Sequence, residues 1–255
     1  MKHLKTQQGF TLVELAIVMT IIGLLIGGIL KGQELMENAR VTSTIAQVRG
    51  YEGAVTTFRD TFSSLPGDMP AAQTRLQNCA ANCTATTGTL GDQVIGSNST
   101  GMTATQNAVG TEPTKFWLHL AKANMISGVT EAAMTGGTPA WGETHPSASI
   151  GGGFIVAYGT GAATAGTWGT TQPIGNNFVL VQQVTQVPNA TPGVQVLSPL
   201  RAAQIDRKMD DGLSTSGSLK AYGLPASCHQ GGPAGNSYNE TSANKDCGLA
   251  FTMNN

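Results

Sequence analysis

The chain has 255 residues with 14 basic and 15 acidic side chains, and only 11% of its residues are charged and 5% aromatic. This length suits one ordinary domain with an additional segment, and the low charge together with 33 glycines favours a loop-rich, partly β structure over a helical bundle. From residue 63 onward there are eight basic and ten acidic residues, so the composition indicates no surface for nucleic acid.

The first predicted element is an apolar helix close to the N-terminus. Residues 1–8 are polar and basic, and residues 10–30 form a run of 21 residues whose only charged side chain is Glu14. About 20 apolar residues span a bilayer, whereas a secretory signal peptide has a shorter apolar core followed by a small-residue cleavage site. Because Lys2 and Lys5 precede the run, the positive-inside rule leaves the N-terminus in the cytoplasm and exports the rest.

The same helix is predicted to continue over residues 31–65 as an amphipathic segment. Apolar side chains recur there every three or four positions, which is the spacing of one helix face. They are Val41, Ile45, Val48, Tyr51, Val55, Phe58 and Phe62. Pro66 and Gly67 then end the helix. At about 1.5 Å per residue, a helix over residues 10–62 is roughly 80 Å long, and we expect its second half to pack on a globular domain.

The beginning of the apolar run resembles a known processing signal. Gly9-Phe10-Thr11-Leu12-Val13-Glu14-Leu15, after a basic leader and before a long helix, is similar to the class III signal of type IV prepilins and of type II secretion pseudopilins. The strong resemblance covers about residues 5–70. A weaker resemblance to large pilin-like proteins runs through the later segments TKFWLHLAKANMISG and QIDRKMDDG.

The resemblance implies that a prepilin peptidase cleaves after Gly9, removes residues 1–9 and methylates the amino group of Phe10. In a filament, Glu14 then faces the cationic N-terminus of a neighbouring subunit, and a charge in apolar surroundings persists when it is paired. The implied partners are the peptidase, the inner membrane and other pilin subunits; no cofactor is implied. The alternative is a plain single-pass anchor, in which Glu14 lies near the lipid headgroups.

Residues 66–255 are expected to form the exported domain, beginning with a Pro/Ala/Thr-rich connection and an exposed loop over 84–111. Helices are predicted at 112–121, with Trp117, Leu120 and Ala121 on its buried face, and at 198–212. Strands are predicted at 153–158, 177–183, 194–197 and 218–222, and the tail from residue 228 is predicted to be looped. His119 has no neighbouring ligand in the sequence, so we expect a surface or capped histidine there.

The four cysteines fall as two local pairs, Cys79 with Cys83 and Cys228 with Cys247. An even number in an exported domain favours disulfides, although four cysteines allow three connectivities. A zinc site made from all four is the competing interpretation. Structural zinc sites usually have two to four residues between paired cysteines, and the 18 residues between Cys228 and Cys247 fit that pattern poorly.

The remaining acidic residues and histidines could belong to a calcium site or a catalytic site. Asp206, Asp210 and Asp211 offer the carboxylate oxygens that calcium prefers, and some pseudopilins hold calcium in their terminal loops. The EF-hand spacing is missing, however, and Asp210-Asp211-Gly212 fits a helix end equally well, so calcium binding stays open. No catalytic triad or paired-carboxylate pattern stands out among the four histidines and scattered acids, and we do not expect an enzyme.

Together these features predict an α+β, pilin-like fold: a long N-terminal helix, its first half in the membrane, packed on a small antiparallel sheet with a loop-rich C-terminal region. The expected function is that of a structural subunit, a major or minor pilin of a type IV pilus or related filament. The alternatives are a pseudopilin of a type II secretion system and a membrane-anchored periplasmic enzyme. The expected location is the inner membrane before assembly and a periplasmic or cell-surface filament afterwards.

Overall fold

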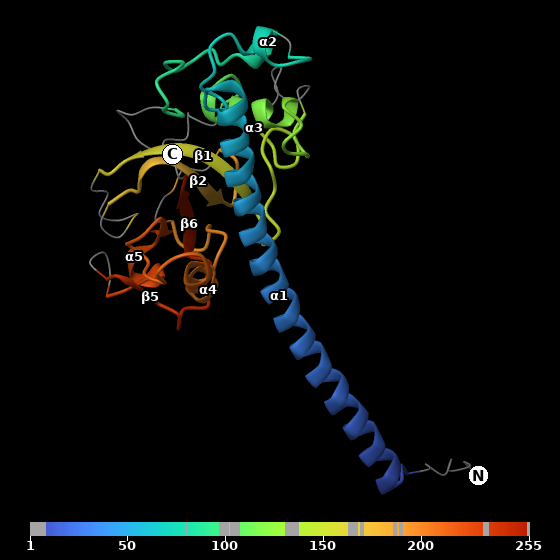
Figure 1. Ribbon diagram of the computed structural model, residues 1–255. Coiled ribbons are helices and arrows are strands. Elements are labelled where there is room, and N and C mark those ends of the chain that lie inside the picture. Colours follow the sequence, from blue (N-terminus) through green and yellow to red (C-terminus); the bar gives the residue numbers. More distant parts are fainter. Residues whose placement is uncertain are drawn as a thin grey trace, which may run out of the picture. The chain divides into compact units, whose positions relative to one another are not determined.

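The computed structural model describes residues 9–79, 81–96, 102, 108–130, 138–162, 168, 171–185, 188, 191–231 and 235–253. Its elements in chain order are α1 (Leu12–Phe62), α2 (Ala72–Arg75), η1 (Ala81–Cys83), α3 (Glu112–Lys122), β1 (Gly153–Thr160), β2 (Ile174–Val181), α4 (Pro199–Met209), β3 (Leu219–Gly223), α5 (Pro225–Cys228), β4 (His229–Gln230), β5 (Ser237–Tyr238) and β6 (Cys247–Thr252) (Figure 1). The chain divides into two compact units, residues 1–40 and 41–255.

Helix α1 contributes its second half to the core of residues 41–255. Four side chains of the predicted stripe are buried, namely Val41, Val48, Val55 and Phe58, and the other three pack against the same core while partly exposed. The amphipathic pattern is therefore confirmed. The helix ends at Phe62, and Ser63 follows in the left-handed region at a φ of 48°.

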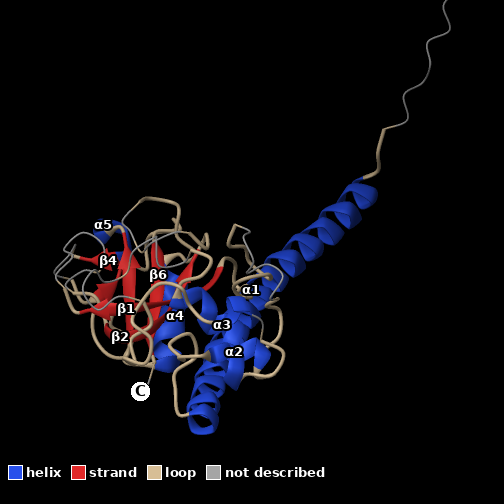
Figure 2. Ribbon diagram, turned by 90° about the horizontal axis from the view of Figure 1, so that it is seen from above, coloured by secondary structure: helices blue, strands red, loops and turns tan. Residues whose placement is uncertain are grey.

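Helix α3 lies beside α1 and completes the helical layer (Figure 2). Thr111 is its N-cap, and Pro113 occupies its first turn, where the missing N–H costs no hydrogen bond. Trp117 and Leu120 are fully buried, as predicted. The ring of Tyr51 on α1 lies 5.1 Å from that of Trp117 and 5.5 Å from that of Phe154 on β1, so α1, α3 and the sheet share one apolar core.

The main sheet has four antiparallel strands in the order β1-β2-β6-β3. Successive side chains point to opposite faces. Phe154 and Val156 belong to the cluster that contains α1 and α3, whereas Ile155 and Ala157 belong to a second cluster with Trp168 on the other face. Both faces of the sheet are therefore covered, which is why β1 reads as a continuous apolar run.

Two predictions for the C-terminal part are wrong. Residues 194–197 form no strand, because Leu197 makes a single β-bridge to Cys247 and the pairing does not continue. The tail after residue 228 is not simply looped, because β6 lies inside the sheet between β2 and β3. Residues 247–251 are buried throughout and include small side chains such as Gly248 and Ala250, so the sequence shows no alternation of polar and apolar residues there.

The described part of the predicted exposed loop over 84–111, namely residues 84–96, 102 and 108–111, is irregular, as expected, but some of its residues are buried. Ile95 is fully buried, and its N–H donates to the Asn176 side chain on β2 at 2.9 Å. Asn176 in turn donates to the Gln93 carbonyl at 2.9 Å. Further along, the Gly96 N–H donates to Glu112 at 2.8 Å. Side chains of β2 and α3 therefore hold the segment against the domain.

Candidate functional site

The N-terminal helix begins with a capping box made by Thr11 and Glu14. The Thr11 N–H and hydroxyl donate to Oε2 of Glu14 at 2.8 and 2.7 Å, and the Glu14 N–H approaches the Thr11 hydroxyl at 3.3 Å. This reciprocal pattern satisfies N–H groups that have no partner inside the helix. The sequence carries the T-x-x-E spacing before an apolar run, and this spacing is the local signal that predicts such a box.

Oε1 of Glu14 is left without a hydrogen bond to any described residue, because the capping contacts all involve Oε2 or the main chain. A carboxylate can accept hydrogen bonds at both oxygens. One oxygen of Glu14 therefore starts the helix, and the other can accept a hydrogen bond from a group outside this chain.

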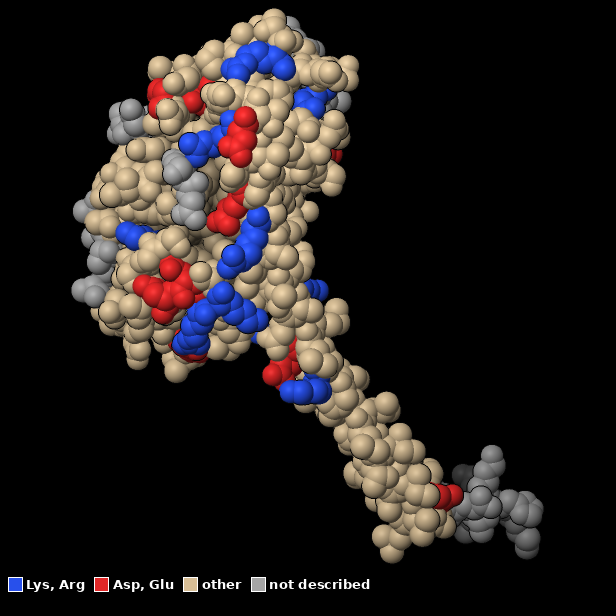
Figure 3. Space-filling view, in the orientation of Figure 1, with Lys and Arg blue, Asp and Glu red and all other residues tan. Residues whose placement is uncertain are grey.

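Around and beyond Glu14 the helix presents an apolar surface that no described residue covers. Fourteen large apolar side chains of this segment are exposed, from Phe10 at 89% to Leu30 at 62%; they are Phe10, Leu12, Val13, Leu15, Ile17, Val18, Met19, Ile21, Ile22, Leu24, Leu25, Ile26, Ile29 and Leu30. This part of the surface is almost free of charged side chains (Figure 3). Among the described residues, α1 is long and apolar enough to span a membrane.

The polar groups of this segment are satisfied locally or lie at its end. The Thr20 hydroxyl donates to the Ile17 carbonyl at 2.8 Å, so it needs no water inside an apolar medium. Lys31 pairs with Glu34 at 2.7 Å, where the apolar run stops.

The four glycines of the segment, Gly23, Gly27, Gly28 and Gly32, have open space around them. A Cβ built at any of them would meet no atom of the rest of the chain within 4 Å. Contacts with the described residues therefore do not account for these glycines. Glycines spaced by four let two helices approach closely, and this surface is available to a helix of another molecule.

The predicted cleavage point lies just before the helix. Gly9 and Phe10 are exposed and have no regular secondary structure, and the helix starts two residues later at Leu12. A peptidase can reach an extended, exposed peptide bond without unwinding a helix. The rest of the predicted leader, residues 1–8, lies outside the described residues.

The structure joins the cysteines as Cys79–Cys83 and Cys228–Cys247, with Cα atoms 5.6 and 5.2 Å apart. Both distances lie in the range that disulfides adopt. The first bond closes the small turn that ends in η1, and the second ties α5 to the first residue of β6.

The aspartates considered for calcium come together after α4, with one oxygen of each within 4.8 Å of the others. Asp206 accepts from the Tyr238 hydroxyl at 2.7 Å and from the Gly212 N–H at 3.1 Å, and burial raises the pKa of Asp206 to about 6. Asp210 accepts from the Leu219 N–H at 2.9 Å. These bonds hold the turn between α4 and β3, which is a structural role that needs no ion.

His119 is fully buried on α3, so of the two expected alternatives the surface position is wrong, whereas a capped histidine fits, because both ring nitrogens have hydrogen-bond partners. Its Nδ1 accepts from the Gly67 N–H at 2.8 Å, so Nε2 carries the proton and donates to the Cys83 carbonyl at 2.9 Å. Burial lowers the pKa of His119 to about 4. The neutral ring joins α3 to the turn after α1 and to the Cys79–Cys83 loop.

Comparison with protein families identifies a motif at the N-terminal end of the chain. Residues 4–30 match the family model described as the prokaryotic N-terminal methylation motif. No curated protein and no solved structure matches the chain. The match covers the apolar segment and the residues around the predicted cleavage point.

Proposed function

The chain carries the class III signal of the type IV pilin and pseudopilin family. We propose that it is a structural subunit, either major or minor, of a type IV pilus or related filament. In this proposal residues 1–9 are the leader, 10–30 form the membrane and filament-core helix, and 31–65 continue the helix into the exported domain. Residues 66–255 complete that domain. The subunit resides in the inner membrane before assembly and is then incorporated into a filament.

The observation that carries the proposal is the uncovered apolar helix directly behind the methylation motif. Fourteen exposed apolar side chains between residues 10 and 30 need a cover of lipid or protein. A bilayer supplies that cover before assembly, and the same helices of neighbouring subunits supply it afterwards. The open glycines allow such helices to approach closely.

Glu14 has a specific role in this proposal. After cleavage the new amino group belongs to Phe10, one residue before the capping threonine. The free Oε1 of Glu14 accepts a hydrogen bond from the Phe10 ammonium group of a neighbouring subunit, while Oε2 keeps its hydrogen bonds to Thr11. In apolar surroundings each charge then has a partner, which removes the largest cost of burying either one.

A pilus is favoured over a secretion pseudopilus by the size of the exported part. Removal of nine residues from 255 leaves a mature chain of about 246 residues, and long Gly/Thr-rich loops suit a displayed subunit better than a compact pseudopilin. The pseudopilin is the second candidate, because the same signal serves both kinds of filament.

Mass spectrometry of the N-terminal peptide and of sheared surface filaments tests the proposal. We expect a mature chain that begins with N-methylated Phe10 and is present in the filament fraction. Gly9→Val should block processing, since this peptidase family requires a small residue before the cut, whereas Gly32→Val, outside the signal, should be processed normally. A mature chain that begins at Met1 or beyond Leu30 would refute the proposal and favour a plain anchor or an anchored enzyme.

A further inference from the structure

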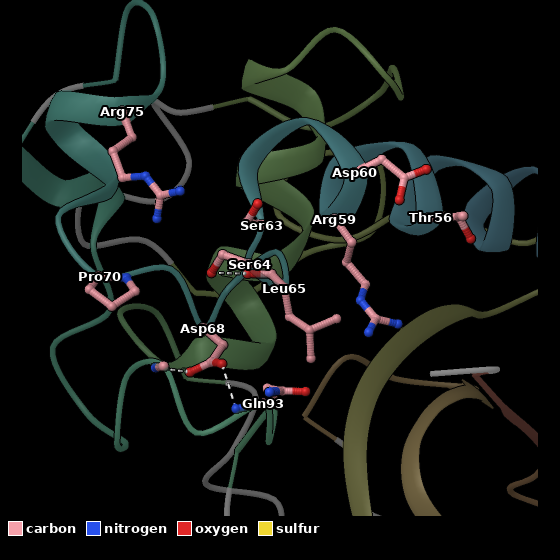
Figure 4. Close-up of a pocket in the computed structure, with 11 residues that line it drawn as sticks. Thr56, Arg59, Asp60, Ser63, Ser64, Leu65, Asp68, Pro70, Arg75 and Gln93 are labelled. Carbon is pink, nitrogen blue, oxygen red and sulfur yellow. Dashed lines mark hydrogen bonds between the residues drawn. The ribbon is translucent and has the colours of Figure 1, made fainter.

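A surface pocket of about 560 Å³ lies where helix α1 ends (Figure 4). Its wall includes Arg59 and Ser63 from the end of α1, Asp68 from the following turn, Arg75 from α2 and Gln93 from the loop before α3. All these residues belong to the unit of residues 41–255. The pocket is therefore a feature of the exported domain and separate from the apolar segment.

Three side chains in this wall have unused hydrogen-bonding groups. Arg59 is half-buried, yet its guanidinium forms no hydrogen bond or ion pair with any described residue. The Ser63 hydroxyl and the Gln93 amide group likewise have no partner in the described part of the chain. A half-buried guanidinium loses part of its hydration, so a partner there is worth more than at an exposed site.

The acidic residues of the wall do not neutralise Arg59. Asp68 is buried, and its two carboxylate oxygens accept the N–H groups of Gly91 and Gln93, the second at 2.8 Å. Asp60 points away from the Arg59 guanidinium (Figure 4). The remaining cation, Arg75, donates to the Phe62 carbonyl and so caps α1. Arg59 is therefore a cation of the wall without a bonded partner among the described residues, in a wall that also contains the carboxylates of Asp60 and Asp68.

We propose that this pocket binds a carboxylate group. A guanidinium presents two parallel N–H donors that match the two oxygens of a carboxylate. In this site the Arg59 guanidinium holds the carboxylate, and the free Gln93 amide lies in the same wall. The carboxylate belongs either to a small free acid or to an acidic side chain of a neighbouring copy of this chain, and the experiment separates the two sources.

The first assay is calorimetric titration of the full chain in detergent with sodium succinate, against sodium chloride of equal ionic strength. We expect saturable binding that Arg59→Gln weakens at least tenfold. Arg59→Lys keeps the charge near the helix end but loses the paired donors, and it should weaken binding several-fold. Arg49→Gln is the matched control, because it removes the same charge from the same helix at an exposed position outside the pocket.

The second assay measures how much of each variant enters sheared filaments, after thermal denaturation has shown that the variant folds. A loss of succinate binding specific to Arg59→Gln identifies a free carboxylate. A loss of filament incorporation specific to Arg59→Gln identifies an acidic side chain of a neighbouring copy. If Arg59→Gln and Arg49→Gln behave alike in both assays, the proposal is refuted. The succinate titration does not depend on filament formation, so it still tests carboxylate binding by the pocket if the pilin proposal fails.

Discussion

Two glutamates begin helices in opposite surroundings. Glu14 opens α1 at an exposed position and shares its carboxylate with Thr11. Glu112 opens α3 inside the domain, where it is 1% exposed and its Oε1 is buried without a hydrogen bond. Burial raises the pKa of Glu112 to about 7, although the hydrogen bond from the Gly96 N–H acts in the opposite direction and lowers the pKa. The same residue type is thus a helix start in one place and a source of pH dependence in the other.

The role of Glu14 can be tested by separating its charge from its cap. Glu14→Gln keeps an acceptor for the Thr11 N–H but removes the charge, and Glu14→Ala removes both. If the carboxylate pairs with the neighbouring ammonium, both variants should lose filament incorporation, because an unpartnered buried charge costs about 3–5 kcal/mol. Glu14→Asp should be intermediate. Sheared-filament assays beside membrane-fraction blots of the same variants provide the measurement.

Membrane insertion is the control for these variants. It should be unchanged or improved in Glu14→Ala and Glu14→Gln, because a charge in the apolar segment opposes insertion. Normal filament incorporation by Glu14→Gln would show that the carboxylate serves only as a helix cap, and a plain anchor would then explain the segment.

Glu112 should make the domain less stable as the pH rises. Its folded pKa of about 7 lies above its ordinary value of 4.5, so the folded state holds the proton more tightly and loses stability between those two values. Glu112→Gln removes this loss, which we expect to be about 1–3 kcal/mol after allowance for solvent screening. Urea unfolding of wild type and variant from pH 4 to pH 8 measures the difference.

The free energy of unfolding must be compared between wild type and Glu112→Gln at each pH, because the buried histidines make the domain more stable as the pH rises. Burial lowers the pKa of His119, His145 and His229 to about 4, 3 and 4. Each therefore adds stability as the pH rises from its lowered folded pKa to its ordinary value of 6.5. A difference between wild type and Glu112→Gln that does not change with pH would contradict the assignment to Glu112.

At the scale of elements, the sheet depends on the last strand of the chain. Strand β6 pairs with β2 and β3, and it places Leu249 and Phe251 in the cluster that contains α1 and α3. The Cys228–Cys247 disulfide fixes its first residue to α5. The Leu197 N–H donates to the Cys247 carbonyl at 2.9 Å, and the Cys247 N–H donates in return at 3.0 Å. The sheet therefore cannot be complete before the C-terminus is in place.

The two disulfides should differ in their contribution to stability. The Cys228–Cys247 bond joins residues 19 positions apart and the Cys79–Cys83 bond residues 4 positions apart. Chain entropy assigns about 3 kcal/mol to the longer loop and about 2 kcal/mol to the shorter one. Replacing both cysteines of a pair by alanine should therefore lower the free energy of unfolding more for Cys228 and Cys247, as measured in urea.

Replacing both cysteines of a pair by alanine leaves no unpaired thiol in either variant, so the losses in the free energy of unfolding of the two double variants can be compared directly. Cys228 and Cys247 are also fully buried, and lost packing adds to the effect in the same direction. A larger loss from the Cys79 and Cys83 double variant would contradict this ranking, and labelling of four free thiols in native protein would contradict both disulfides.

At the scale of the whole molecule, the division at residue 40 separates two kinds of surface. Residues 10–30 expose apolar side chains, whereas residues 41–255 bury a core of their own. Val41, Val48, Val55 and Phe58 of α1 belong to that core. The second half of α1 is therefore part of the domain, although it is continuous in sequence with the apolar segment.

A pair of truncations tests this division. A chain that begins at Lys31 should be soluble, folded and monomeric, because it lacks the exposed apolar run and keeps the buried stripe. A chain that begins at Ser63 should not fold, because it loses four core side chains worth roughly 1.5–3 kcal/mol each, which together approach a typical total stability. Circular dichroism and size-exclusion chromatography measure both outcomes; a cooperatively folded chain from Ser63 would contradict the assignment.

Local patterns in the sequence were enough to predict the long helix, its apolar and amphipathic halves, α3, α4 and strands β1 to β3. Helix periodicity, apolar runs and end signals such as Pro66-Gly67 act over a few neighbouring residues, so they can be read directly from the chain. The methylation motif is also a contiguous stretch, and residues 4–30 match it. The T-x-x-E cap was equally visible, although its meaning became clear only with the hydrogen bonds of Thr11 and Glu14.

Features that depend on contacts between distant parts of the chain became visible only in the folded structure. Strand β6 shows no alternation because it is buried on both faces, and its place between β2 and β3 follows from pairing with residues far away in sequence. His119 and Glu112 have no local signal of burial; His119 is bonded across 52 residues to Gly67, and Glu112 across 16 to Gly96. Their surroundings, and with them their pKa values, are set by burial and by these partners, which a residue's immediate neighbours in the sequence do not determine.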